Sequence, residues 1–179
     1  DTPMPIREVR QLGDPVLRVV DASVDDPGAP EVAALIDDLR DTLAHWRATT
    51  GYGRGIAAPQ IGVLQRVVFL NIDGGSPWSL INPELVVKSA ATMEVWDGCL
   101  SFLTIFFKTR RHCSVTLRYQ DQSGTWHECA ADCGLSELLQ HEVDHLDGIL
   151  TLDHLTDTRT IISRQEFEKH FRADSPYAE

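Results

Sequence analysis

The sequence lacks a long hydrophobic run and an excess of basic residues. None of its apolar stretches approaches the roughly 20 residues that a membrane-spanning helix needs. Lys and Arg number 16 against 27 Asp and Glu, so the formal net charge is -11. Nucleic acids and anionic lipid surfaces bind clustered positive charge. The composition therefore argues against nucleic acid and against a membrane as partners.

Cysteine is also scarce, and the four cysteines are Cys99, Cys113, Cys129 and Cys133. An even number permits two disulfides, but in a chain of this size the spacing resembles no disulfide framework. We therefore expect reduced thiols and a cytoplasmic protein of bacterial type, or an organellar-matrix protein if a transit peptide has been removed. A reduced cysteine is free to bind a metal.

Hydrophobic residues make up 42% of the chain, enough for a single domain over residues 1–179. Apolar positions at helical spacing predict an amphipathic helix over residues 30–48. Strands are predicted over residues 66–72, 93–96 and 114–119, and the last alternates strictly between apolar and polar side chains. A further strand, broken by a turn, is expected over residues 80–83 and 84–87.

Helices and strands do not alternate as they do in parallel α/β proteins, which indicates the α+β class. We expect mixed or antiparallel sheets around a central helix that begins near Cys133 and carries the motif described next. The first amphipathic helix should pack outside. Residues 1–5 are expected to form an N-terminal arm, and residues 156–179 a C-terminal extension that is helical in part.

The expected central helix contains the motif His-Glu-x-x-His, with His141, Glu142 and His145. Side chains four residues apart on a helix project from one face, so both imidazoles can reach one metal ion. Glu142 lies near the edge of that face, where it can accept a proton from water on the metal. A surface helix with two solvated histidines is the alternative interpretation.

A metal site of this kind needs at least one more ligand, and the residues leave three options open. The extended His-Glu-x-x-His pattern of one protease class would place a third histidine where this chain has Thr151. A later carboxylate, Glu166 or Glu168, would give a metallopeptidase arrangement. Cys99 is the third option, because it lies in a glycine-containing turn that can present a thiolate.

Alternating glycines characterise residues 51–62. The segment is a weak phosphate-binding candidate, since it ends without Lys-Ser/Thr and follows a helix where a dinucleotide-binding loop follows a strand. Glycine permits close approach by another chain, so the alternative is that this backbone pairs with an extended peptide. The amide of Gln60 would then point into the site.

Three ordered motifs resemble those of peptide deformylases. They are Gly53-x-Gly55-Ile56-Ala57-Ala58-Pro59-Gln60, Gly98-Cys99-Leu100-Ser101 and Gln140-His141-Glu142-x-Asp144-His145-Leu146. The segments around Gly13 and Asn82 are also similar, so the resemblance extends from about Ile6 to Leu155. Each motif alone is weak evidence, whereas the ordered set is specific.

The resemblance implies a metal-dependent hydrolase that removes the formyl group from peptides beginning with formyl-methionine. It implies that Cys99, His141 and His145 bind the metal, that metal-bound water is the nucleophile and that Glu142 is the general base. The Leu100 N–H and the Gln60 side chain would stabilise the oxyanion. The residues implied or expected to contact substrate are Gly53, Arg54, Gly55, Ile56, Asp97, Gly98, Glu137 and Leu138.

The resemblance further implies one divalent metal ion per chain, natively Fe(II), with Zn(II), Ni(II) or Co(II) as alternatives. A thiolate with two imidazoles suits all of these. The expected partners are N-formylated peptides or nascent chains, including chains at the ribosome. The protein is expected to be a monomer or weak dimer.

Two features depart from the family pattern around the cysteine. Asp97 stands where the family usually has glutamate, and Arg110 or Arg111 is its expected charge partner. The family's Pro-Gly after Cys-Leu-Ser is replaced by the apolar residues 102–107. That run is interpreted as a buried strand or, alternatively, as an apolar rim for substrate.

Glu137 is a third departure, because it lies one helical turn before His141 and faces a pocket wall that is apolar in the family. Arg54 is positioned to reach the same space. One hypothesis is that the two pair and that the preferred first side chain of the substrate is not methionine. The alternative is that both extend to solvent. A catalytically silent relative that binds peptides is a further alternative function.

Overall fold

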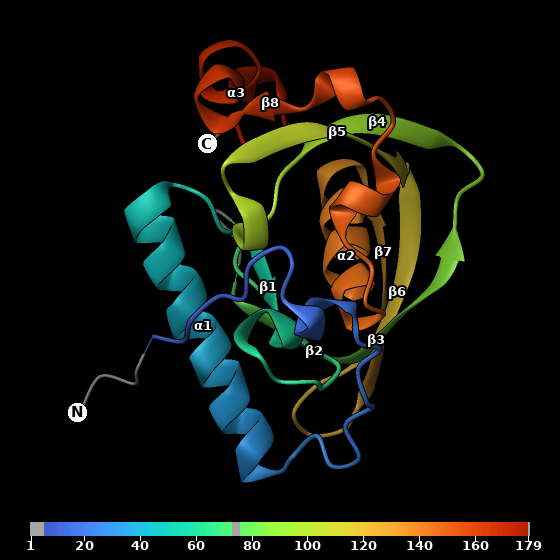
Figure 1. Cartoon of the computed structure of the whole chain (residues 1–179). Coiled ribbons are helices and arrows are strands. Elements are labelled where there is room, and N and C mark those ends of the chain that lie inside the picture. The colour runs from blue at the N-terminus through green and yellow to red at the C-terminus, as the bar shows by residue number, and fades with distance from the viewer. Residues whose placement is uncertain (1–5, 73–75, 179) are drawn as a thin grey trace.

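The computed structural model describes residues 6–72 and 76–178, so the expected N-terminal arm at residues 1–5 lies outside the described part. Figure 1 shows helix α2 (Cys133–Leu146) surrounded by strands, with α1 (Pro30–Thr50) on the outside and α3 (Arg164–His170) near the C-terminus. This arrangement confirms the predicted α+β class with a central helix. No helix in the described ranges combines the length and hydropathy required for a membrane span.

Two antiparallel sheets make up the strand layers. The larger sheet has the order β1-β2-β3-β6-β7, and the smaller has the order β4-β5-β8. The bounds of the strands are β1 Gly55–Ala57, β2 Val67–Leu70, β3 Trp78–Lys88, β4 Thr92–Asp97, β5 Ile105–His112, β6 Ser114–Gln120, β7 Trp126–Asp132 and β8 Ile162–Ser163. Short 3-10 helices connect them: η1 Pro15–Arg18, η2 Ala58–Ile61, η3 Leu100–Phe102, η4 Thr151–His154, η5 Thr158–Thr160 and η6 Arg172–Asp174.

Strand β2 shows how the sequence builds a core on both faces of the larger sheet. Successive side chains of a strand point to opposite faces. Val67 and Phe69 pack in a cluster with the apolar stripe of α1, whereas Val68 and Leu70 pack in a cluster with α2. Both faces are therefore buried, and α2 is held between the sheet and the segment that carries Cys99.

Strand β3 differs from the predicted strand in that no turn breaks it. It is continuous over 11 residues, and the expected turn is an irregularity in register between Ile81 and Glu84. Asn82 has φ 50°, and its side chain bonds both the N–H and the C=O of Val24. Because Pro83 has no N–H to donate, a bulge accommodates it without ending the strand.

Within residues 102–107, Phe106 and Phe107 are fully buried in strand β5, as the buried-strand interpretation expected, whereas Leu103 lines the pocket described below. The ring of Phe106 stacks on Phe167 of α3, with centroids 3.9 Å apart and an interplanar angle of 2°. Phe167 also contacts Trp96 of β4. This aromatic cluster fixes the C-terminal segment against the smaller sheet.

Replacing Phe167 by alanine tests this anchoring. Removing a fully buried phenylalanine leaves a cavity and costs about 3–5 kcal/mol in unfolding free energy, measured by urea denaturation. Phe171→Ala is the matched control, because that ring is 40% exposed, and its loss should be about 1 kcal/mol. Equal losses for the two variants would contradict the proposed role of the cluster.

Candidate active site

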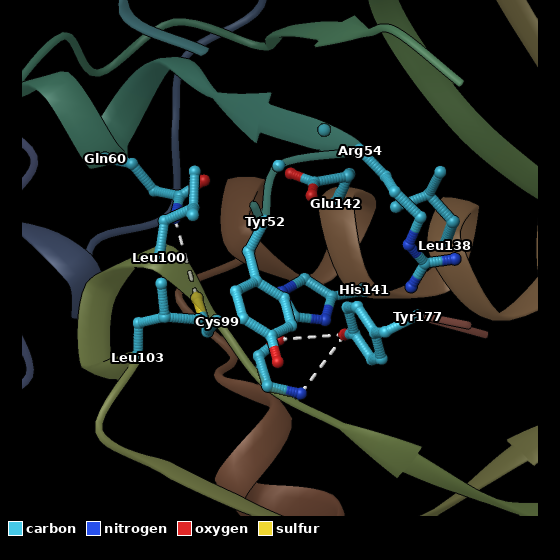
Figure 2. Close-up of a pocket in the computed structure, with 13 residues that line it drawn as sticks. Tyr52, Arg54, Gln60, Cys99, Leu100, Leu103, Leu138, His141, Glu142 and Tyr177 are labelled. Carbon is cyan, nitrogen blue, oxygen red and sulfur yellow. Dashed lines mark hydrogen bonds between the residues drawn. The ribbon is translucent and has the colours of Figure 1, made fainter. Parts of the chain in front are cut away.

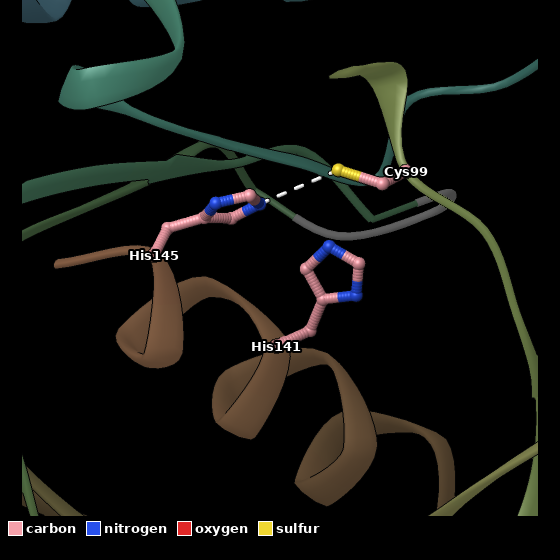
Figure 3. Close-up of side chains that lie close together, drawn as sticks. All are labelled: Cys99, His141 and His145. Carbon is pink, nitrogen blue, oxygen red and sulfur yellow. Dashed lines mark hydrogen bonds between the residues drawn. The ribbon is translucent and has the colours of Figure 1, made fainter. Parts of the chain in front are cut away.

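Helix α2 presents His141 and His145 on the side that faces Cys99 (Figure 3). Its opposite side carries Leu139 and Leu146, which pack in the core against the larger sheet. The two imidazoles have ring centroids 5.2 Å apart, as expected for residues one turn apart. All three side chains of the motif are buried, so the solvated-helix interpretation is wrong.

Cys99 completes a compact set of three possible ligands. It follows β4 and directly precedes η3, and its Sγ lies 3.4 Å from Nε2 of His145. The ligand atoms of Cys99, His141 and His145 all lie within 4.8 Å of one another. Two ligands of a tetrahedral metal with bonds of about 2.0–2.3 Å are about 3.5 Å apart, so the set fits a metal ion.

The carboxylates proposed as alternative ligands lie elsewhere. Within the described residues, the only other cluster of this kind consists of Asp97, Glu137 and His141. Glu166 pairs with residues of its own helix α3, and Glu168 accepts a hydrogen bond from Tyr52. Among the three options that the sequence left open, only Cys99 has its ligand atom beside both histidines.

The two histidines differ in protonation. Burial and, to a lesser extent, the neighbouring His141 lower the pKa of His145 to about 3, so the His145 ring is neutral. Burial opposes protonation of His141 too, but the charge of Asp97 holds the pKa of His141 well above its ordinary value. Nδ1 of His141 donates to Oδ1 of Asp97 at 3.0 Å, which leaves Nε2 directed away from that carboxylate.

Asp97 is fully buried behind His141 and does not line the pocket, which differs from the expectation that it contacts substrate. Oδ2 accepts hydrogen bonds from Arg111 Nη2 at 3.4 Å and from the hydroxyl of Thr151. Burial alone would raise the pKa of Asp97, but His141 and Arg111 hold it well below its usual range. The charge partner is thus Arg111, whereas Arg110 is exposed and lies near Glu94.

Glu142 lies directly beneath strand β1. One of its carboxylate oxygens, Oε2, is buried without a hydrogen-bond partner among the residues described. Burial raises the pKa of Glu142 to about 7, although His141 and Arg54 act in the opposite direction. A Cβ at Gly55 would lie 2.8 Å from Oε1 of Glu142, so only glycine allows the strand to approach this carboxylate so closely.

Gln60 and Leu100 offer hydrogen-bond donors next to Cys99. Nε2 of Gln60 lies 3.5 Å from Cys99 Sγ and 3.2 Å from the hydroxyl of Ser101, while its Oε1 accepts from the Ala57 N–H at 2.9 Å. The bond from the Ala57 N–H fixes the orientation of the Gln60 amide. Leu100 is the first residue of η3, and an N–H at that position has no acceptor within its own helix.

A pocket opens beside these groups (Figure 2). Of the residues expected to contact substrate, it is lined by Gly53, Arg54, Gly55, Gly98 and Leu138. Ile56 is fully buried in the core, so only its backbone can contribute. Strand β1 is at the edge of its sheet and pairs with β2 alone, which leaves its other edge for an extended peptide.

Arg54 and Glu137 form the ion pair that one hypothesis expected. Nη2 of Arg54 lies 2.9 Å from Oε2 of Glu137, and the carboxylate is fully buried. Burial raises the pKa of Glu137, and the charge of Arg54 acts against this rise. Glu137 therefore lies behind Arg54 and does not itself line the pocket.

The sequence reasoning missed several contributors to the site. Tyr177 lines the pocket, and its hydroxyl donates to Asp97 Oδ1 and accepts from the Gly98 N–H, both at 3.1 Å. Tyr52 and Leu103 also line it. Tyr177 belongs to no local motif. Thr151 was considered only as a metal ligand, and its position beside Asp97 depends on tertiary structure.

A thiol and two imidazoles around one point, beside a buried carboxylate, are typical of metal-dependent hydrolases. Comparison with known proteins identifies the family. The sequence profile of the Polypeptide deformylase family matches residues 6–160. Peptide deformylase of Bartonella tribocorum is 34% identical over 174 residues, covering 93% of each chain. The crystal structure of peptide deformylase from Thermotoga maritima superposes with a TM-score of 0.79 at 31% identity, covering 86% of this chain and 100% of that one.

A second similar structure is a complex of the class I type b peptide deformylase from Acinetobacter baumannii with Met-Ala-Ser. It is 25% identical with a TM-score of 0.77, covering 84% of this chain and 99% of that one. The chain therefore belongs to the polypeptide deformylase family. Members of this family are metal-dependent enzymes that hydrolyse the N-formyl amide bond of peptides, and the protein is a hydrolase of this kind.

Asp97→Asn tests the buried charge network. The substitution leaves Arg111 with Asp144, at 2.6 Å, as its charged partner and removes the anion that faces both Arg111 and His141, which should cost about 2 kcal/mol in unfolding free energy of the metal-free protein. Asp37→Asn removes the exposed partner of Arg40 and should cost about 0.5 kcal/mol. Urea denaturation measures both. A loss below 1 kcal/mol for Asp97→Asn would contradict the network's role in stability.

Proposed function

We propose that the protein removes the formyl group from N-formylated peptides with Cys99, His141 and His145 holding a catalytic divalent metal ion. The observation that carries this proposal is the convergence of the three ligand atoms within 4.8 Å, next to the buried Glu142. When bound there, the metal supplies a Lewis acid that acidifies the attacking water and polarises the formyl carbonyl. Asp97 orients His141 for this role through the bond to Nδ1.

Glu142 is the proposed general base and then the general acid. Its carboxylate accepts a proton as water attacks the formyl carbon, and later gives that proton to the leaving amine nitrogen. The C–N bond breaks, and the products are formate and a peptide with a free N-terminus. The close packing of Gly55 against Glu142 keeps the carboxylate at one position under the bound peptide.

Gln60 and Leu100 are the proposed oxyanion donors. The Gln60 amide is held by its bond to the Ala57 N–H, so Nε2 is oriented before the substrate arrives. The Leu100 N–H is left for the substrate by its place at the start of η3. Donors fixed in advance stabilise developing charge without reorganisation during the reaction.

The substrate backbone is proposed to add to the free edge of β1. Residues 53–56 supply the N–H and C=O groups, as in other cases where a peptide extends a sheet. The Met-Ala-Ser complex of the Acinetobacter baumannii relative supports a peptide as occupant of this site. Ile56 contributes through its backbone, because its side chain is in the core.

The native metal proposed is Fe(II), with Zn(II), Ni(II) and Co(II) as ions that the same ligand set accepts. The proposed substrates are N-formylated peptides or nascent chains, including chains at the ribosome, in a bacterial-type cytoplasm or an organellar matrix. The proposed oligomeric state is a monomer or weak dimer. The net charge of -11 supports the absence of nucleic-acid and membrane partners.

Glu142→Gln should lower kcat for formyl-Met-Ala-Ser by about 10²–10⁴-fold with unchanged metal content, because the amide cannot accept the proton. Formate release and metal analysis measure the two quantities. Glu166→Gln, an exposed carboxylate on α3, is the control and should retain full activity. Retained activity in Glu142→Gln would rule out this carboxylate as the base.

Cys99→Ala should reduce metal affinity by more than about 100-fold. Removing a group that only supports a ligand costs up to about that factor, and this variant removes a ligand itself. Equilibrium dialysis against Zn(II) or Co(II) measures it. Cys113→Ala and Glu168→Gln are controls that should bind metal like the unmodified protein. If Glu168→Gln lost the metal and Cys99→Ala kept it, a carboxylate-ligated metallopeptidase would be supported instead.

A further inference from the structure

Arg54 and Tyr177 separate the pocket beside Glu142 from a second cavity. The pocket beside Glu142 has a volume of about 30 Å³, and the second cavity has a volume of about 320 Å³. Both are lined by Tyr52, Gly53, Arg54, Leu138 and Tyr177, so these residues form a shared wall. Figure 2 shows the Arg54 and Tyr177 side chains next to each other at the end of the pocket away from Gln60.

We propose that this wall selects the first side chain of the substrate, favouring a short hydrogen-bonding side chain such as serine over methionine. The inference rests on the proposed function, since it concerns the residue whose formyl group is removed. It names Tyr177 and Arg54 as specificity-determining residues. The first of these comes from the C-terminal segment, outside the residues 6–160 that match the family.

The volume of the pocket supports a short side chain. About 10–15 Å³ of cavity volume is needed to hold one water molecule, so about 30 Å³ has room for about two. The serine side chain has two heavy atoms, whereas that of methionine has four. The same pocket is lined by Cys99, His141 and Glu142, so it must also hold the formyl group, and the longer methionine side chain needs space on the far side of the wall, in the larger cavity.

Tyr177 is held in place at both ends of its ring. Its hydroxyl accepts a hydrogen bond from the Gly98 N–H at 3.1 Å, and its single proton faces two acceptors, Asp97 Oδ1 at 3.1 Å and the Gly98 C=O at 3.2 Å. The Arg54 guanidinium lies 4.4 Å from the centroid of the same ring. The ring also packs edge-on against Phe106. Moving it costs hydrogen bonds, a cation–π contact and aromatic packing together.

Glu137 holds Arg54 from its other side. The pair still has polar atoms to which a substrate can hydrogen-bond. Nε of Arg54 is buried with no hydrogen-bond partner in the described part of the chain, as is Oε1 of Glu137. A hydroxyl or amide oxygen on the first side chain can accept from Arg54. A methionine thioether is a weak acceptor and would leave this donor unsatisfied.

The test compares kcat/KM for formyl-Ser-Ala-Ser and formyl-Met-Ala-Ser. Because both peptides meet the same enzyme, their ratio does not depend on the fraction of active or metal-loaded protein. The unmodified protein should favour the serine peptide by about 10-fold or more. Tyr177→Ala opens the wall to the larger cavity and should shift the ratio toward methionine by about 10-fold or more.

Two further variants make the test specific. Tyr177→Phe keeps the ring and should retain most of the serine preference. The double variant Arg54→Leu with Glu137→Leu removes both charges together, so neither stays buried alone, and it should also shift the ratio toward methionine. Phe171→Ala, near the C-terminus but away from the pocket lining, should leave the ratio unchanged.

The outcomes separate this inference from the proposed function. Formate release with methionine preferred by the unmodified protein, and an unchanged ratio in Tyr177→Ala, would overturn the wall while leaving the deformylase mechanism intact. That result is expected if the C-terminal segment moves aside when substrate binds. No formate from either peptide with metal bound would overturn both.

Discussion

The site depends on one buried interaction, the contact of Asp97 with the groups that surround it. Its two oxygens receive hydrogen bonds from Arg111 of β5, His141 of α2, Thr151 of η4 and Tyr177 near the C-terminus. A carboxylate fully removed from water is stable as an anion only when its oxygens are satisfied in this way. The same residue therefore joins four distant segments and orients a metal ligand. A glutamate there would be longer by one methylene, and the Tyr177 hydroxyl could not keep the same position.

The parts of the site that the sequence predicted are those governed by local geometry. His141 and His145 lie on one helix face because they are one turn apart, whatever the helix packs against. The same periodicity predicted that Glu137 lies on the side of the helix that carries His141, and from this the pairing with Arg54 was predicted. Helix α1 was predicted over residues 30–48 and extends over Pro30–Thr50. The two agree closely because the apolar stripe and the glycine C-cap of this helix are both local features of the sequence.

The parts that the sequence did not predict depend on tertiary packing. Tyr177 reaches Gly98 across 79 positions of chain, guided by the packing of Phe167 on Phe106, and no periodicity encodes that return. Strand β1 was also missed, since three residues rich in glycine and alanine show no strand pattern until β2 pairs with them. Thr151 gained its role only because η4 brings its hydroxyl to Asp97.

The charges of the interior explain why the site suits a divalent cation. Asp97, Glu137 and Glu142 are buried, and a metal-binding Cys99 adds a fourth anion as a thiolate. The cations beside them are the half-buried Arg54 and the buried Arg111, and His141 must be a neutral imidazole to bind a metal, so two negative charges then have no counterpart. Without a further cation, burial holds the pKa of Glu142 near 7, and part of this carboxylate is protonated at neutral pH. A divalent ion at the three ligands supplies the missing charge and favours ionised Glu142, the form that can accept a proton from water.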